Sequence, residues 1–208
     1  MAPGAAIIPK QISGGQSNTV ASIELPSVNE ACDHYATVKT RLMDINNWGQ
    51  ISNNLAEFKL TDAEGNLKMS RPEEGDHIRI NLPAPGTAGS GAYEWVMIEY
   101  IVSKSSIMAD YESAALLVRP APNPVRGGGE IAHFFKDDAT TTFLVRRDGN
   151  TIIAGVHGRN ETPNTDVYTL LDSIRNIIVG IGAILGFSKV QWKSLVNGLI
   201  SLPEYKKP

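Results

Sequence analysis

The sequence predicts an α+β protein in which about six to seven antiparallel strands provide an apolar surface for a long C-terminal helix. Two observations carry this prediction. Between residues 166 and 185, branched apolar side chains recur at steps of three and four, which places them in one stripe along a helix. Between residues 56 and 160, short alternating runs are separated by turns rich in Gly, Pro, Asn and Asp, which is typical of strands.

Both ends of the predicted C-terminal helix are marked in the sequence. Thr165 is placed to cap the first free amides, and Asp166 puts a negative charge at the positive end of the helix dipole. Gly186 favours the left-handed conformation that closes a helix. At about 1.5 Å per residue the helix would be roughly 30 Å long, about the width of a small domain.

A short strand and a helix precede the main run of strands. Residues 20–25 predict the strand, and Ser27 with Glu30 three residues later forms a capping box for a helix over 28–43. Residues 44–49 break that helix, and a second helical turn leads towards Leu55. The strands that follow are predicted at 57–61, 67–69, 76–82, 93–102, 111–118, 130–136, 140–147 and 151–160.

The sequence closes with a further short helix. Ser188 is placed to cap the segment 189–202, which Pro203 ends. This segment carries four apolar side chains on one side: Trp192, Leu195, Val196 and Leu199. Before residue 20 the sequence has no periodicity. We therefore expect a flexible N-terminal arm at 1–19, one domain at 20–187, and an additional helix and tail at 188–208.

Composition limits the classes of function. The chain has 208 residues, of which 42% are hydrophobic and 20% charged, as expected for one globular domain. A net charge of −3 and a pI near 5.8 give no basic surface of the kind that nucleic-acid binding needs. The single cysteine, Cys32, excludes an internal disulfide. The longest apolar stretch, 177–187, is about half as long as a membrane span, and no signal sequence is recognisable, so we expect a cytoplasmic protein.

The order of the elements resembles the helix-grip fold of the START-like, or SRPBCC, superfamily. The resemblance extends over about residues 20–185 and rests on the order strand, helix, strand meander and long C-terminal helix. Locally it rests on Pro26-Ser27 before the first helix and on the segment 44–48, which ends in Trp48, after it. Relative to that pattern, the first helix is long and the segment 189–202 is an addition.

The resemblance implies a curved antiparallel sheet wrapped around the C-terminal helix, with an apolar cavity between them. It also implies that the protein binds or transports a hydrophobic or amphipathic small molecule, such as a lipid, without a cofactor. Cyclase- or hydrolase-like chemistry on such a molecule is the alternative within the superfamily. An all-β barrel closed by the helix would use the same strands, and only the pairing order separates the two folds.

Ionisable side chains gather at the end of the last strand. His157 and Arg159 alternate with apolar neighbours and therefore share one face of the strand. If that face lines the cavity, His157 is placed to act as a base or hydrogen-bond donor, and Arg159 to hold a ligand carboxylate in two hydrogen bonds. The alternative is that Ile152, Ala154 and Val156 face inward, because that set is more uniformly apolar.

The longest strand and its neighbour carry further candidates. Trp95 and Met97 project to one side of the strand, and Glu99 follows them there. An inward carboxylate is costly without a partner, and Arg119 at the end of another strand can supply one. The complete set of predicted cavity residues is Tyr93, Trp95, Met97, Glu99, Arg119, His133, Phe135, His157 and Arg159.

The other histidines are scattered along the sequence. His133 alternates with Ile131 and Phe135, which makes it a candidate for an inward-facing histidine. His34 and His77 fall on polar faces, where we expect them to be solvated. The spacing of these residues does not predict a metal site.

A third hypothesis is that the protein is an interaction module. The apolar side chains of segment 189–202 would then be presented to a partner protein or to a second copy of the chain, giving a homodimer. An exposed apolar patch on this helix would favour an interaction module over ligand binding.

Overall fold

The computed structural model describes residues 7–81, 93–106, 110–125, 135–163 and 189–203. The predicted helix at 166–185 and His133 lie outside these residues. Within them the elements follow in the order β1 (Gly15–Glu24), α1 (Val28–Met43), η2 (Ile45–Asn47), α2 (Trp48–Ile51), β2 (Glu57–Thr61), β3 (His77–Asn81), β4 (Glu94–Ser106), β5 (Tyr111–Pro120), β6 (Thr140–Asp148) and β7 (Thr151–Glu161). Residues 189–200 form the additional helix predicted after residue 188, and from here on the name C-terminal helix refers to this helix alone.

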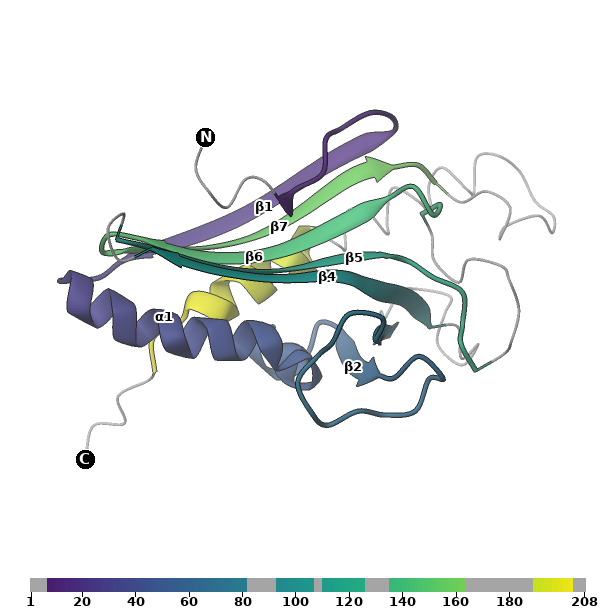
Figure 1. Cartoon of the computed structure of the whole chain (residues 1–208), viewed down its shortest axis with the longest axis horizontal. Helices are drawn as coiled ribbons and strands as arrows, with labels where there is room; N and C mark the ends of the chain where they lie inside the picture. Colours follow the sequence, from purple (N-terminus) through teal and green to yellow (C-terminus); the bar gives the residue numbers. More distant parts are fainter. Residues whose placement is uncertain (1–6, 82–92, 107–109, 126–134, 164–188, 204–208) are drawn as a thin grey trace.

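Seven strands form one curved sheet in the order β1-β7-β6-β5-β4-β3-β2 (Figure 1). Every neighbouring pair is antiparallel, and the first strand pairs with the last. Gly149, with a φ of 59°, makes the tight turn between β6 and β7, where a side chain would be strained. Because β1 and β2 form the two edges, the sheet is open and the barrel alternative is not observed. The predicted α+β class and its antiparallel sheet are confirmed.

The first helix begins where the sequence predicts. Ser27 lies at its N-cap, where the side-chain oxygen accepts a hydrogen bond from the backbone amide of Glu30 at 3.2 Å. Its hydroxyl also lies 3.0 Å from Oε1 of Glu30, so the two residues of the predicted capping box contact each other. The side chains buried along α1 share one stripe: Ala31, His34, Tyr35, Val38 and Leu42.

Trp48 fixes the end of α1 against the core. Its side chain is fully buried, and Nε1 donates to the backbone oxygens of Arg41 and Leu42 at 3.1 and 3.2 Å. These carbonyls belong to the last turn of the helix, where oxygens lack an intrahelical partner. Trp48 is therefore a core residue that also satisfies the helix end.

The helices cover one face of the sheet. In Figure 1, α1 and the C-terminal helix (yellow) lie on the same side of the strands. Side chains of these helices and alternate positions of the strands form one hydrophobic core. We call the face of the sheet that contributes to this core the inner face, and the opposite one the outer face. Inner-face positions include Val96, Ile98, Leu116, Phe143 and Ile152.

The C-terminal helix is held against α1 by polar contacts as well as by the core. A guanidinium nitrogen of Arg41 donates to the backbone oxygens of Leu199 and Ser201 at 3.0 and 2.6 Å. Nε2 of His34 lies 2.9 Å from the backbone oxygen of Ile200, and His34 is 7% exposed. The prediction that His34 is solvated was therefore wrong, because its partner comes from a helix that is distant in the sequence.

The packing of the C-terminal helix determines where its apolar side chains lie. Leu195, Val196 and Leu199 are buried in the core, and Trp192 packs against it. These side chains are therefore occupied by the protein's own sheet and helices. No helix among the residues that the structure describes is long and apolar enough to cross a membrane.

The predicted strand at 67–69 is reduced to an isolated bridge between Thr61 and Leu67, and two other strands are longer than predicted. β1 begins at Gly15, earlier than predicted, because its first residues pair with the end of β7. β4 extends to Ser106 and is interrupted by a bulge between Ile98 and Tyr100, which shifts the alternation of faces in its second half.

Candidate functional site

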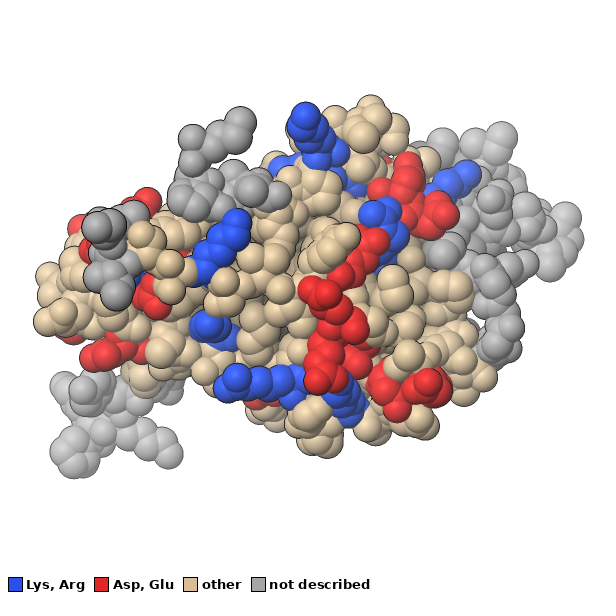
Figure 2. All heavy atoms as spheres, in the orientation of Figure 1, with Lys and Arg blue, Asp and Glu red and all other residues tan. Residues whose placement is uncertain are grey.

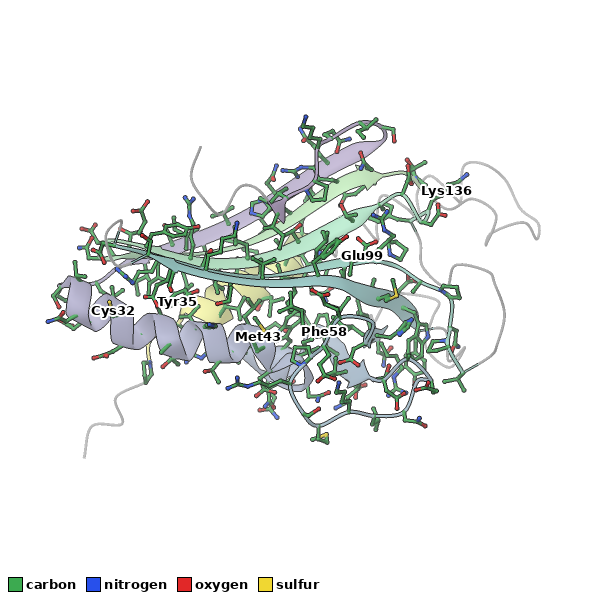
Figure 3. The ribbon with its side chains drawn as sticks, in the orientation of Figure 1. Cys32, Tyr35, Met43, Phe58, Glu99 and Lys136 are labelled. Atoms are coloured by element: carbon green, nitrogen blue, oxygen red, sulfur yellow. The ribbon has the colours of Figure 1, made fainter. Side chains whose placement is uncertain are left out.

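Four aromatic rings meet in the core between α2, β2, β6 and the C-terminal helix. Trp48 contacts Phe143 with ring centroids 4.6 Å apart and Phe58 at 5.5 Å. Trp192 completes the cluster, at 5.5 Å from Phe143 and 6.1 Å from Phe58. Figure 3 shows Phe58 on the α1 side of the sheet. The inner face therefore holds an aromatic cluster that includes Trp192 of the C-terminal helix.

Gln191 adds a polar group to this apolar region. It lies one turn before Leu195 and two turns before Leu199, so it shares their stripe on the helix. The side chain is fully buried, and neither Nε2 nor Oε1 has a hydrogen-bond partner. A buried amide without partners typically costs on the order of 1 to 3 kcal/mol. Such a group on an otherwise apolar stripe is a candidate contact for a bound molecule.

Glu161 places a carboxylate at the end of β7, next to the start of the C-terminal helix. Its Oε1 accepts a hydrogen bond from Oγ of Ser17 at 2.8 Å. The carboxylate occupies the space in which Gly158 would carry a side chain, so a methyl group at Gly158 would overlap it. Burial raises the pKa of Glu161, while Ser17 and the nearby charges of Arg159 and Lys189 oppose that rise.

The residues predicted from the sequence lie on the outer face instead. Ile152, Ala154 and Val156 are 0 to 2% exposed and belong to the inner core, so His157 and Arg159 point the other way. The alternative of an inward Ile152, Ala154 and Val156 is therefore the observed one.

The strand register brings the predicted residues into two rows on the outer face. Met97 lies opposite both His77 and Arg119. In the next row, Thr142 of β6 lies opposite both Leu117 and His157. The structure therefore places Trp95, Met97, Glu99, Arg119, His157 and Arg159 on one face, which is the face away from α1 and from the helix at residues 189–200. The predicted cavity beside residues 166–185 lies outside the described residues. His133 lies outside the described residues.

Glu99 and Arg119 form the ion pair that the sequence suggests. Nε of Arg119 lies 2.6 Å from Oε1 of Glu99, and a terminal nitrogen of Arg119 lies 3.3 Å from Oε2. Arg119 also donates to the backbone oxygen of Asp137 at 2.7 Å. The carboxylate of Glu99 is thus held bidentately by a guanidinium that is itself anchored to a neighbouring turn.

His157 and Arg159 are held by β1. Nδ1 of His157 lies 2.8 Å from Oδ1 of Asn18, and Arg159 contacts the same oxygen at 2.9 Å. Arg159 also donates to the backbone oxygens of Ser17 and Gly158. Burial lowers the pKa of His157, and the positive charges of Arg159 and Arg146 lower it further. These two side chains therefore join the edge strand to the sheet and are already engaged by protein groups.

Other outer-face residues are buried without complete pairing. Arg79 lies 4.5 Å from the ring centroid of Tyr93, a cation–π contact. Trp95 is 2% exposed, and its Nε1 lacks a partner, as does Nδ1 of His77. The side chain of His77 is half-buried and not fully solvated as predicted, and burial lowers its pKa.

Three further observations complete the description of the predicted residues. Phe135 is 7% exposed, forms an isolated bridge with Pro163 and lies outside the inner core. Among the described residues, no three His, Cys, Asp or Glu side chains are placed to hold a metal ion. Sequence reasoning did not identify Gln191, although its spacing from Leu195 and Leu199 places a polar residue on an apolar stripe.

The strand order, with the first strand beside the last and helices on the inner face, defines a helix-grip protein in its described elements. No protein-family model matches the chain, and no curated protein matches it in sequence. Among solved structures, a hypothetical protein of Helicobacter pylori is 12% identical with a TM-score of 0.46, the match covering 88% of this chain and 87% of that one.

Two plant proteins are also among the structural matches. A major latex-like protein of Panax ginseng is 10% identical with a TM-score of 0.31, covering 86% of this chain and 99% of that one. A truncated norcoclaurine synthase of Thalictrum flavum is 10% identical with a TM-score of 0.31, covering 85% and 95%. These similarities are too distant to assign a function to this chain.

Proposed function

We propose that the protein binds an apolar or amphipathic small molecule between the inner face of the sheet and the C-terminal helix, without converting it chemically. The observation that carries this proposal is the amide of Gln191, fully buried and unpartnered in an otherwise apolar stripe. Binding sites for small molecules combine apolar walls with a few polar groups that orient the ligand. The aromatic rings and Gln191 together have this composition.

The chemistry of Gln191 restricts the class of ligand. Its amide offers two donor hydrogens and one acceptor oxygen, all uncharged. A ligand with an apolar body and a single carbonyl, hydroxyl or amide group would satisfy it without bringing a charge into the core. The rings of Trp48, Phe143 and Trp192 would contact the apolar body.

No contact among the described residues specifically supports the enzyme alternative or the interaction-module alternative. His157 lies on the outer face with its Nδ1 engaged by Asn18. The apolar side chains of the C-terminal helix are buried in the core. Ligand binding on the inner face is therefore the function that the described residues support best.

Native mass spectrometry of the gently purified protein, followed by denaturing extraction, tests the proposal. We expect a stoichiometric small molecule with an apolar body on the wild-type protein. The substitution Gln191→Leu keeps the volume and removes the amide, so we expect less retained ligand. We also expect the free variant to be more stable than the wild type by about 1 to 3 kcal/mol, because the unpaired group is gone.

Val190→Leu is the matched control, because Val190 lies next to Gln191 on the same helix but is 59% exposed. It should leave both ligand retention and stability unchanged. Wild-type protein that carries no small molecule, together with a Gln191→Leu variant of unchanged stability, would contradict the proposal.

A further inference from the structure

A groove separates the solvent-facing side of α1 from the loop that follows β2. Its volume is about 480 Å³, which is within the range of small-molecule sites. One wall is the C-terminal half of α1 with Asp44, and the other is the segment 69–71. The lining residues are Ala36, Lys39, Thr40, Met43, Asp44, Met69, Ser70 and Arg71. The α1 wall of the groove lies beside the stripe that packs into the core, because Met43 lines the groove and also packs against the core.

Hydrogen bonds fix the loop wall of this groove. Nδ2 of Asn46 donates to the backbone oxygen of Lys68 at 2.9 Å, and the backbone amide of Lys68 donates to the oxygen of Leu60 at 2.9 Å. Nζ of Lys68 lies 2.8 Å from Oδ2 of Asp76 and also pairs with Glu73. Lys68 therefore ties the loop to the sheet, and residues 69–71 that follow it form a wall of the groove.

The charges in the groove are unequal. Lys39 and Arg71 are its two cations, and Asp44 is its one carboxylate. Nζ of Lys39 donates to Oγ of Ser103 at 2.7 Å, which leaves two of its hydrogens for a ligand. Within the described part of the chain, no carboxylate forms an ion pair with Arg71, whereas Asp44 accepts a hydrogen bond from Asn47. Figure 2 shows basic side chains gathered beside acidic ones on this part of the surface.

The groove is also lined by two thioethers, of which Met69 is exposed. Met69 is 86% exposed, which is unusual for a large apolar side chain on a fixed loop. Met43 projects from the end of α1 and is half-buried (Figure 3). The hydroxyl of Thr40 donates to the backbone oxygen of Ala36 at 2.9 Å, so its polar group is satisfied within the helix. Flexible methionine side chains adapt to apolar ligands of different shape.

From this combination we infer that the groove binds an amphipathic anion, with a carboxylate or phosphate head group on Lys39 and Arg71 and an apolar chain along Met43 and Met69. Arg71 supplies a planar guanidinium that matches such a head group bidentately, and Lys39 supplies a second positive charge. The site is separate from the one proposed between the inner face and the C-terminal helix.

Methyl-labelled methionine provides a direct test, because the chain contains only five methionines and two of them, Met43 and Met69, line this groove. We would titrate dodecyl phosphate, below its micelle-forming concentration, and follow the methionine methyl resonances by NMR. The resonance of Met69 should shift, with a smaller change at Met97 on the outer face. Lys39→Gln and Arg71→Gln should each weaken binding about tenfold, and the control Lys104→Gln on β4 should not.

Two further probes separate head group from chain. Dodecyl maltoside, which is neutral, and inorganic phosphate, which has no chain, should each bind much more weakly than dodecyl phosphate. No shift at Met69, or affinity that Lys39→Gln and Arg71→Gln leave unchanged, would overturn the inference. If dodecyl maltoside bound as tightly as dodecyl phosphate, the inferred preference for an anionic head group would be wrong. If inorganic phosphate bound as tightly, the inferred contact with an apolar chain would be wrong. None of these results depends on the ligand retained on the inner face.

Discussion

The two faces of the sheet are both largely buried in their centres, but they carry different kinds of polar group. On the outer face Glu99 pairs with Arg119, and His157 contacts the side chain of Asn18. Two nitrogens on the same face, Nε1 of Trp95 and Nδ1 of His77, have no partner. On the inner face nearly every side chain is apolar, and the buried amide of Gln191 has no partner. Residues that look catalytic in the sequence therefore hold strands together, while the amide of an inconspicuous glutamine has no partner.

The largest expected effect concerns the inner face. Trp48→Ala removes a fully buried ring and both hydrogen bonds to the end of α1. We expect a loss of about 3 to 5 kcal/mol in the free energy of unfolding, measured by urea denaturation. A loss below about 1 kcal/mol would mean that the aromatic cluster does not hold the core together.

Two milder substitutions, one in the inner core and one on the outer face of the sheet, compare the two faces directly. Trp48→Phe and Trp95→Phe make the same chemical change, but Nε1 of Trp48 has two acceptors and Nε1 of Trp95 has none. Removing the paired indole should cost about 1 kcal/mol more than removing the unpaired one. Equal effects in the same urea experiment would indicate that the two indoles are paired alike in solution.

The dependence of stability on pH tests the carboxylate at the end of β7. Because burial raises the pKa of Glu161, the folded protein holds that proton more tightly than the unfolded chain. Stability should therefore fall as the pH rises from the ordinary pKa through the raised folded value. Glu161→Gln cannot ionise, so it should be more stable than the wild type at neutral pH and lose this advantage in acid.

The exposed Glu64, in the turn after β2, provides the control for that measurement. Glu64→Gln should follow the wild-type curve of stability against pH. If Glu161→Gln and the wild type also gave superimposable curves, the carboxylate of Glu161 would be as solvated as an exposed one.

The smallest effect is expected for Glu99→Gln on the outer face. The side chains of Glu99 and Arg119 are 20% and 33% exposed, so the ion pair is partly screened by solvent. We expect a loss of less than about 1 kcal/mol in stability and no change in the ligand retained on the inner face. A marked loss of retained ligand would move the binding site to the outer face.

Several features of the fold followed from the sequence because they depend on local chemistry. The capping box at Ser27 and Glu30, the apolar stripe of α1 and the uniformly apolar set of Ile152, Ala154 and Val156 each identify their own environment. The turn at Gly149 is equally local.

The functional site could not be predicted in the same way, because it depends on contacts between distant segments. β4 is apolar on both faces around Trp95, Val96, Met97 and Ile98, so alternation alone does not say which side is inner. His34 is buried by the end of the C-terminal helix, which is far away in the sequence. A glutamine at an apolar spacing gives no sign that its amide will lack a partner.

The most direct test of the account is to measure the small molecule that remains bound to three purified proteins: wild type, Gln191→Leu and His157→Gln. Native mass spectrometry gives the bound fraction of each, and urea denaturation verifies that all three are folded. The account predicts that Gln191→Leu loses most of the ligand while His157→Gln retains it as the wild type does. Loss in His157→Gln with full retention in Gln191→Leu would contradict the assignment of the binding site to the inner face.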